Sequence, residues 1–374
     1  MKRISPLLYE WSRYDARTQR DANGHFVLPA AGESGVLVDP PPFNEGDEAH
    51  VRSLGGVAAV VLTTGRHLRD AARGGQVFGC PVLVPAADLP AVVETGHSTA
   101  QGYPAEGDLP CGLSATPVPH GPSPGETALY SPVDGGTVIV GDAVVGDPLG
   151  RLSLPQPANP AEAAGVARGL RALLARRLNR LLVAHGQSVL QGPVPLLQDL
   201  IYAHDPHAFL IRAGECHWGP ARLFGRRFGS RAAEYTRLLG LKAIDFELTE
   251  LPPGRQSFPL HRHDAEEELF IIAEGQGEVR TERDGTTQRV PIGAGDVLAF
   301  PPRFQLAHAI VNTGHAPLRY FAFSAHAEAV EMADYPTSGA RMERTPYGKY
   351  RRFPLPERLD MPYFEGEPID EAVE

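Results

Sequence analysis

Cysteine is scarce in this sequence. The chain of 374 residues has three cysteines, Cys80, Cys111 and Cys216, and no two of them form a CxxC pair. This scarcity argues against a disulfide-stapled scaffold and against a cysteine-rich zinc ribbon. Few, scattered thiols are typical of a reducing compartment, and we therefore expect a cytoplasmic protein.

The chain also lacks an excess of basic charge and any long apolar run. Lys and Arg number 35 against 45 Asp and Glu, which gives a formal charge of −10 and a pI near 5.8. Nucleic acids and anionic membranes bind clustered Lys and Arg, so neither is an expected partner. No stretch approaches the roughly 20 apolar residues of a membrane-spanning helix. The opening MKRISPLLYEWSRYD does not have the pattern of a secretion signal.

Glycine and proline, in contrast, are abundant. The 40 glycines and 36 prolines favour short strands and turns over a helix bundle, and the length suggests two domains. In the first half, Asn159-Pro160 predicts the start of a helix, because Asn caps well and Pro suits the first helical position. The stretch 21–24 (DANG) predicts a hairpin turn. The expected strands are 35–39, 57–62, 81–84, 137–140 and 181–184.

Polar residues follow these strands in a distinctive order. The sequence presents, in turn, Asp39, the segment 63–70 (TTGRHLRD), His120 in a turn rich in Pro and Gly, Asp142 and His185-Gly186. This order resembles the metallo-β-lactamase fold over roughly residues 10–205. The resemblance implies an α+β domain, an αββα sandwich, that occupies residues 1–205.

The main metal motif of that family, HxHxDH, is degenerate here. The matching turn TTGRHLRD keeps only His67 among its histidines. Arg66 or Arg69 would place a positive charge where a dication should lie, which is electrostatically unfavourable. The departure implies that the two-metal hydrolytic centre has been lost. The alternative is a vestigial or single-metal site formed by His67, His120, Asp142 and His185.

The second half carries another group of metal-ligating residue types. His261 and His263 lie one residue apart, Glu268 follows, and His308 comes about forty residues later. Neutral imidazoles and a carboxylate together bind borderline divalent metals. Alternation along a strand directs His261 and His263 to the same face, whereas Glu268 needs a bulge or bend in HDAEEE to join them. Glu266 and Glu267 are expected in a solvated turn.

Two motifs in this half resemble those of the cupin superfamily. The first is Gly254, His261-Arg262-His263, Glu268 and Gly275, and the second is Gly295, Pro301, His308 and Asn312. The first spacer is one residue longer than usual, and Arg303 occupies a place where glycine is common. The resemblance implies an all-β double-stranded β-helix barrel that binds one divalent metal through His261, His263, Glu268 and His308. Fe, Mn, Ni and Zn are all compatible with such ligands.

The expected organisation is therefore a lactamase-like domain (1–205), a linker (206–231), a cupin barrel (232–330) and a C-terminal extension that packs on the barrel (331–374). Three functions remain open. The first is a metal-dependent cupin enzyme acting on a small polar metabolite. The second is a binding or sensing module that captures a small molecule without chemistry. The third is a hydrolase that uses the first domain. Exposed barrel edges make a homodimer a reasonable expectation.

Overall fold

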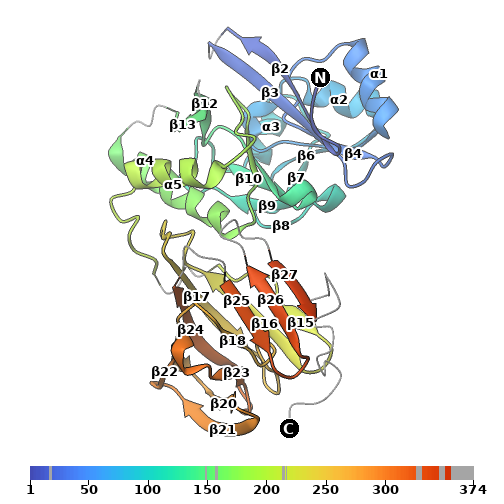
Figure 1. Ribbon diagram of the computed structural model, residues 1–374. Helices are drawn as coiled ribbons and strands as arrows, with labels where there is room; N and C mark the ends of the chain where they lie inside the picture. Colours follow the sequence, from blue (N-terminus) through green and yellow to red (C-terminus); the bar gives the residue numbers. More distant parts are fainter. Residues whose placement is uncertain are drawn as a thin grey trace. The chain divides into compact units, whose positions relative to one another are not determined.

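The computed structural model describes residues 1–16, 19–147, 150–155, 159–212, 215, 217–325, 331–344 and 350–354 (Figure 1). The chain divides into two compact units, Met1–Leu210 and Ile211–Glu374, and each is described by itself. Among these described residues, no helix is long and apolar enough to cross a membrane.

The first unit contains a mixed sheet with the strand order β1-β2-β3-β4-β5-β6-β7. Its first four strands are antiparallel neighbours, and β4 to β7 are parallel neighbours joined through helices, as parallel pairing requires. The strands are β1 (Lys2–Ser5), β2 (Leu8–Asp15), β3 (Arg20–Val27), β4 (Gly35–Val38), β5 (Val57–Val61), β6 (Val82–Pro85) and β7 (Gln101–Tyr103). The helices are α1 (Glu45–Leu54), η1 (Gly65–His67), α2 (Ala71–Phe78) and α3 (Leu89–Glu94).

A second sheet of this unit has the order β14-β11-β10-β9-β8, and β12 pairs with β13 beside it. Its parallel pair, β11 and β14, is connected through α4. The strands are β8 (Gly107–Asp108), β9 (Ser114–Pro117), β10 (Thr127–Ser131), β11 (Thr137–Val140), β12 (Val145–Asp147), β13 (Arg151–Ser153) and β14 (Arg180–Val183). The helices are η2 (Pro110–Gly112), η3 (Val133–Gly135), α4 (Pro160–Leu170), η5 (Arg171–Ala175) and α5 (Pro193–His204).

The core of the first unit lies between these two sheets. One cluster of buried side chains joins Val36 and Val61 of the first sheet to Leu129 and Ile139 of the second. Another cluster packs the opposite face of the first sheet against Val51 of α1 and other helical residues. The first unit is therefore a mixed α/β domain in which helices cover one face of its first sheet.

The expected helix start and apolar strands are confirmed. Asn159 caps α4, and its side chain accepts hydrogen bonds from the backbone N–H groups of Ala161 and Glu162, both at 3.0 Å. Each expected strand corresponds to one of β4, β5, β6, β11 and β14 to within a residue or two at either end. Local pattern was sufficient here because these strands are short, apolar and bounded by Gly, Pro or Asp.

The hairpin turn expected at 21–24 is wrong. These residues lie inside β3, which pairs with β2 from Arg20 opposite Asp15 onward. Asn23 is not a turn residue, because its amide donates to the carbonyls of Val183 and Gly186, each at 2.8 Å. Gly24 is required by close packing, since a Cβ at this position would lie 2.3 Å from the Pro41 ring.

The second unit is built of strands. Its sheets have the orders β15-β16-β17-β24-β19-β22, β21-β20-β23 and β18-β25-β26-β27. The strands are β15 (Arg222–Phe224), β16 (Phe228–Glu234), β17 (Ile244–Leu251), β18 (Arg262–His263), β19 (Glu268–Glu274), β20 (Gln276–Arg283), β21 (Thr286–Gly293), β22 (Val297–Phe300), β23 (Ala307–Val311), β24 (Leu318–Ala325), β25 (Glu331–Tyr335), β26 (Ala340–Arg344) and β27 (Tyr350–Pro354), and η7 spans Pro302–Phe304.

The core of this unit lies between its sheets. Phe270 and Tyr320 of one sheet pack against Val279 and Ile310 of another. Backbone bridges close the structure where Gln256 meets Val311 and where His261 meets His308. The four expected metal ligands lie in these strands or directly beside one: His261 precedes β18, His263 lies in β18, Glu268 in β19 and His308 in β23.

The ends of this unit carry more structure than the expected linker and extension. Residues 206–231, expected as a linker, include β15 and the first part of β16, which pairs with β15; the pairing of β16 with β17 begins at Arg231. Residues 331–344, within the expected extension, form β25 and β26, and β25 pairs with β18 through His263 opposite Ala333. The part of the extension after 354 lies outside the described residues.

Candidate functional site

The cupin motifs bring three imidazoles together in the second unit. His261 and His263 come from the short strand β18 and the residue before it, and His308 comes from β23. The two motifs are joined directly by backbone hydrogen bonds: His261 N–H donates to His308 O at 3.2 Å, and His308 N–H donates to His261 O at 2.8 Å. Residues 264–267 form the bend that allows Glu268, at the start of β19, to reach the same point.

The Nε2 atoms of these imidazoles converge on one carboxylate oxygen. Glu268 Oε2 lies 2.8 Å from His308 Nε2, 3.2 Å from His263 Nε2 and 4.0 Å from His261 Nε2. His263 Nε2, His308 Nε2 and Glu268 Oε2 are buried, and none of them has a hydrogen-bond partner among the described atoms. Buried polar atoms without partners are costly, so a group of them aimed at one point fits the ligands of a bound cation.

The other ring nitrogens determine the tautomers. His261 Nδ1 lies 3.0 Å from the Pro259 carbonyl, and His308 Nδ1 lies 3.4 Å from the Leu306 carbonyl. A carbonyl oxygen can only accept, so each Nδ1 carries the proton and donates it. His263 Nδ1 donates in the same way to Glu331 Oε1 at 3.0 Å. In the neutral form of each ring, Nε2 is therefore the nitrogen whose lone pair can bind a metal.

Three carboxylates surround His263, but each has a different partner. Glu266 pairs with Arg344 at 2.5 Å. Glu331 accepts from the backbone N–H groups of Asp264 and Ala265, at 3.2 and 3.1 Å, in addition to His263. Glu268 faces only the imidazoles and is therefore the carboxylate that fits a metal ligand.

The expectation of a solvated turn holds for one glutamate and fails for the other. Glu267 is exposed, whereas Glu266 is only 4% exposed. The reason is Arg344 of β26, which supplies the buried charge partner that Glu266 needs. Sequence reasoning missed Glu331 altogether, because it lies in another strand and no spacing rule connects it with His263.

The pKa values of these ligand-type residues are shifted in different directions. Burial, together with the charges of His263 and His308, lowers the pKa of His261 to about 3, so its imidazole is neutral. Burial would raise the pKa of Glu268, but His263 and His308 outweigh it and hold this pKa well below the usual range. Burial would lower the pKa of His263, yet Glu268 and Glu331 raise it to about 10, so this imidazole must release a proton on binding a cation.

Aromatic rings restrict the imidazoles. Phe300 stacks on His308 with ring centroids 3.7 Å apart, and Tyr335 stacks on His261 at 5.7 Å. The Phe258 ring meets His261 edge-on at 4.9 Å. These apolar walls limit access of water and hold the rings in place. The residues of the second unit therefore fit one divalent metal ion.

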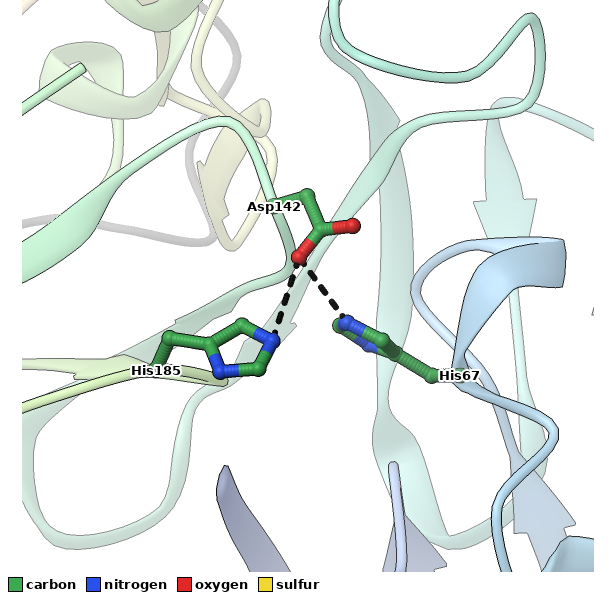
Figure 2. Close-up of side chains that lie close together, drawn as sticks. All are labelled: His67, Asp142 and His185. Carbon is green, nitrogen blue, oxygen red and sulfur yellow. Dashed lines mark hydrogen bonds and ion pairs between the residues drawn. The ribbon is translucent and has the colours of Figure 1, made fainter. Parts of the chain in front are cut away.

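The first unit gathers histidine and carboxylate at the ends of its strands. Asp39 directly follows β4, His67 lies in η1 after β5, Asp142 follows β11, and His185 follows β14. Figure 2 shows His67 and His185 on either side of Asp142, whose Oδ1 lies 3.0 Å from His67 Nε2 and 3.4 Å from His185 Nε2. The structure thus brings together three of the four residues expected in a vestigial metal site.

His120, the fourth, lies elsewhere. Its side chain is exposed, its backbone has a φ of 62°, and its ring rests against Gly165 of α4. A Cβ on Gly165 would come within 2.7 Å of that ring. The long Pro/Gly loop turns this histidine away from Asp142, so it takes no part in the cluster.

His67 is held between two carboxylates. Its Nδ1 lies 3.1 Å from Asp39 Oδ2, opposite the contact of Nε2 with Asp142. Asp39 is fully buried with a φ of 47°, and it accepts from the Thr63 N–H at 2.9 Å and hydroxyl at 2.6 Å. Burial would lower the pKa of His67, but Asp39 and Asp142 outweigh it and raise this pKa to about 9. His67 is consequently an imidazolium with both N–H groups engaged.

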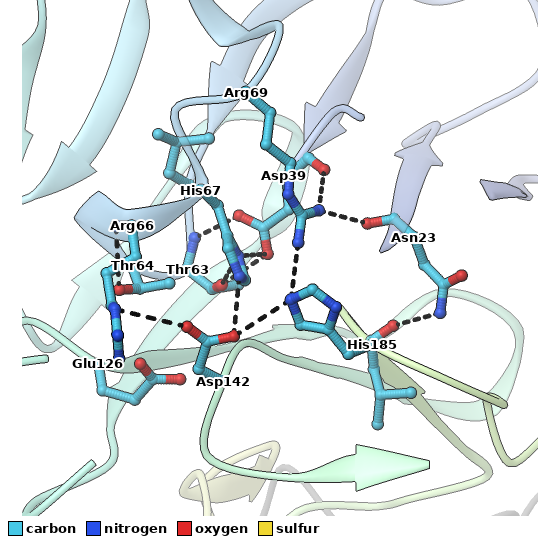
Figure 3. Close-up of polar contacts among 12 residues, drawn as sticks. Asn23, Asp39, Thr63, Thr64, Arg66, His67, Arg69, Glu126, Asp142 and His185 are labelled. Atoms are coloured by element: carbon cyan, nitrogen blue, oxygen red, sulfur yellow. Dashed lines mark hydrogen bonds and ion pairs between the residues drawn. The ribbon is translucent and has the colours of Figure 1, made fainter. Parts of the chain in front are cut away.

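Arg69 supplies a second positive charge to this cluster. Figure 3 shows its guanidinium reaching His185, where Nη2 lies 2.9 Å from Nε2. Nη1 also donates to the carbonyls of Asn23 and Asp39, at 3.2 and 3.3 Å. Both imidazole nitrogens that face Asp142 are thus already engaged: His67 Nε2 carries a proton, and His185 Nε2 accepts a hydrogen bond from Arg69. These residues do not fit a two-metal hydrolytic centre.

Glu126 is a further buried acid that sequence reasoning did not single out. Its Oε1 accepts from the Ala143 N–H at 2.9 Å, and its Oε2 has no hydrogen-bond partner among the described atoms. Burial and the charge of Asp142 raise its pKa to about 8. Its position at the end of a loop rich in Gly and Pro, directly before β10, gave no signal of a polar role.

Two family models match the chain. The model of the metallo-beta-lactamase superfamily matches residues 1–203, more than half of the chain, and the chain belongs to this superfamily. The model of the cupin domain matches residues 247–324. The protein is therefore a fusion of a metallo-β-lactamase-like domain with a cupin domain, and the ligand-type residues His261, His263, Glu268 and His308 all lie within the cupin match.

Solved structures resemble part of the chain. A protein from Acidithiobacillus ferrooxidans assigned as a sugar phosphate isomerase is 23% identical, with a TM-score of 0.36, over 42% of this chain and 99% of that one. A cupin-superfamily sugar phosphate isomerase from Silicibacter pomeroyi is 19% identical, with a TM-score of 0.36, over 41% and 96%. A Thermotoga maritima protein assigned as an oxalate decarboxylase is 28% identical, with a TM-score of 0.27, over 32% and 99%. No curated protein sequence matches the chain significantly.

Proposed function

We propose that the cupin domain binds one divalent metal through His261, His263, Glu268 and His308, and that the protein is an enzyme acting on a small polar metabolite. One observation carries the proposal: three imidazole nitrogens and a carboxylate oxygen converge in a buried place, and the contacts of the Nδ1 atoms turn each Nε2 inward. Fe, Mn, Ni and Zn all accept such ligands.

A metal held there would act as a Lewis acid toward a carbonyl or hydroxyl oxygen of the substrate. The chain's own residues would supply the setting. Phe258 and Phe300 line the imidazoles with apolar surface and exclude water. The electrostatic attraction between Glu268 and a bound cation would be stronger there than in water. A barrel of this size holds side chains or one small ligand, which favours a small substrate with oxygen ligands.

A second candidate function is capture of a small molecule without chemistry. It is favoured by the carboxylates nearest the metal ligands: Glu266 already pairs with Arg344, and Glu331 already accepts three hydrogen bonds. Neither is placed to move a substrate proton without breaking these contacts. Hydrolysis by the first unit is not favoured, because Arg69 and protonated His67 occupy its cluster.

We further infer that the first unit is an αββα sandwich that serves as a scaffold, that the protein works in the cytoplasm on a small-molecule ligand, and that it forms a homodimer. The scaffold role rests on the ion pair between His67 and Asp142, which engages the residues that would otherwise bind a metal. The compartment rests on the scarcity of cysteine, and the dimer on exposed strand edges.

Elemental analysis of the purified full-length chain tests the metal assignment. We expect about one divalent metal per chain, lost on His261→Ala and kept on Asp142→Asn. Retention on His261→Ala with loss on Asp142→Asn would instead support the hydrolase. Turnover of aldoses, ketoses, their phosphates and small dicarboxylates then separates the two cupin functions, since binding without turnover would support the capture module.

A further inference from the structure

Strand β25 lies outside the part of the chain that the cupin family model matches, yet it reaches the ligand cluster. The match ends at residue 324, and β25 begins at Glu331 (Figure 1). β25 pairs with β18 so that Ala333 lies opposite His263. Glu331 is 1% exposed, and its Oε1 accepts from His263 Nδ1 at 3.0 Å.

The carboxylate of Glu331 is itself held firmly. The backbone N–H of Asp264 donates to Oε1 at 3.2 Å, and that of Ala265 donates to Oε2 at 3.1 Å. Both donors belong to the bend between His263 and Glu268. Glu331 therefore fixes the ring of His263 and the segment that delivers Glu268 to the same point.

Glu331 cannot share this task with its neighbour Glu266. Glu266 Oε2 lies 3.9 Å from His263 Nδ1, beyond hydrogen-bond distance, and it pairs with Arg344 of β26 at 2.5 Å. Arg344 thus neutralises Glu266 and leaves Glu331 as the acceptor for His263. Since His263 directs Nδ1 to Glu331 and Nε2 to Glu268, the two carboxylates lie on opposite sides of the ring and do not compete.

We propose that Glu331 is a positioning residue of the metal centre, which orients His263 and keeps its proton on Nδ1 so that Nε2 faces the metal. The proposal rests on the proposed function, because it presumes a metal at His261, His263, Glu268 and His308. It also extends the proposed metal centre beyond residue 324, where the family match ends, because β25 supplies Glu331 and β26 supplies Arg344. Carboxylates that hold a ligating imidazole in this way contribute roughly 10- to 100-fold to metal affinity.

The test compares Glu331→Gln with Glu343→Gln in the full-length chain. Glu343 is half-buried on the neighbouring strand β26 and faces Met332 in the register, so its replacement controls for a changed charge nearby. Gln at 331 offers one acceptor oxygen in place of two and carries no charge. Metal affinity is measured by competition with a chromophoric chelator, and the visible absorption of the Co(II)-loaded protein reports the ligand geometry.

We expect Glu331→Gln to weaken metal binding roughly 10- to 100-fold and to change the Co(II) spectrum, whereas Glu343→Gln leaves both unchanged. Glu331→Ala, which removes the acceptor completely, should weaken binding at least as much. Circular dichroism on all variants checks that the second unit is folded. A wild-type affinity and spectrum in both Glu331 variants would overturn the proposal. If the wild-type chain binds no metal at all, the proposed function fails first, and that result is distinct.

Discussion

The two histidine clusters of this chain differ in the groups that face their carboxylates. In the first unit, His67 lies between Asp39 and Asp142, and Arg69 covers His185, so the positive charges come from side chains. In the second unit, Glu268 faces the Nε2 atoms of three imidazoles, the nitrogens through which the neutral rings could bind a cation. The same residue types thus give a closed polar core in one place and a group that fits a cation in the other.

The comparison of His67 with His261 shows that the partners of the ring nitrogens set the charge of a histidine. His67 has a carboxylate on each side and becomes an imidazolium. His261 has a carbonyl on the far side and stays neutral with a free Nε2. Residue type and spacing alone do not distinguish these cases, whereas the hydrogen-bond partner does.

The largest effect is expected from Asp39→Ala, which tests whether the first cluster is a structural core. The change leaves His67 with one carboxylate and Thr63 without its acceptor, and breaking a buried ion pair costs about 3–5 kcal/mol. Denaturant unfolding of the first unit can be followed by Trp11 fluorescence in a Trp218→Phe chain. Glu33→Ala, at an exposed position, is the control and should be neutral. A loss below about 1 kcal/mol would contradict the structural role.

The pH dependence of the same unit gives the second test. Folding raises the pKa of His67 from 6.5 to about 9, so its stabilisation is complete below pH 6.5 and is lost as the pH rises through 9. The loss amounts to about 3 kcal/mol, at roughly 1.4 kcal/mol per pH unit of pKa difference. Unfolding free energies measured from pH 6 to 10 should fall in the wild type and fall less in His67→Gln.

Glu126 needs a separate control in that experiment. Its pKa is raised from 4.5 to about 8, so its contribution declines over the range from pH 4.5 to 8. A Glu126→Gln chain removes this decline and isolates the part due to His67. If Glu126→Gln abolishes the whole fall above pH 6.5, the assignment to His67 is wrong.

The third test breaks the second cluster. Glu268→Gln removes the negative charge that the imidazoles share, and we expect metal affinity to fall by more than about 100-fold, the upper limit for groups that only support a ligand. The adjacent Glu267→Gln is a matched control, because Glu267 is exposed and should have no effect. Isothermal titration with Mn(II) and Zn(II) measures both. Equal affinities in the two variants would remove Glu268 from the ligand set.

The smallest effect is expected from a substitution that would allow the histidine cluster of the first unit to bind a metal. Arg69→Ala, made in a Glu268→Gln chain, removes the guanidinium from His185 Nε2 and lets His185 and Asp142 face a cation. Occupancy by Zn(II), measured by elemental analysis after dialysis, should rise from none to a measurable fraction and disappear again with Asp142→Asn. Without such a gain, Arg69 would not be what excludes a metal here.

Sequence reasoning succeeded where short-range geometry determines the result. The alternation in HRH and the bend before Glu268 follow from strand periodicity. Asp39 and His67 follow the neighbouring strands β4 and β5 of one sheet, and Asp142 and His185 follow the neighbouring strands β11 and β14 of the other. A fusion of lactamase-like and cupin domains was also evident from motif order.

The rest could not be predicted because long-range pairing determines it. Glu331 meets His263 only because β25 pairs with β18, and no local pattern specifies that register. Glu266 looked solvated because its partner Arg344 lies far along the chain. His120 had suitable neighbours in sequence, but its loop turns it against Gly165.

The backbone bridge between His261 and His308 has a consequence for the lifetime of the protein. Because reciprocal hydrogen bonds tie the two motifs together only in the native fold, an unfolded chain cannot offer both at once. A cation that binds the native state alone stabilises it by RT ln(1 + [L]/Kd), or about 2.7 kcal/mol at a hundredfold excess over Kd. The supply of metal in the cell would then set how often the second unit opens to proteases, and so how much protein accumulates.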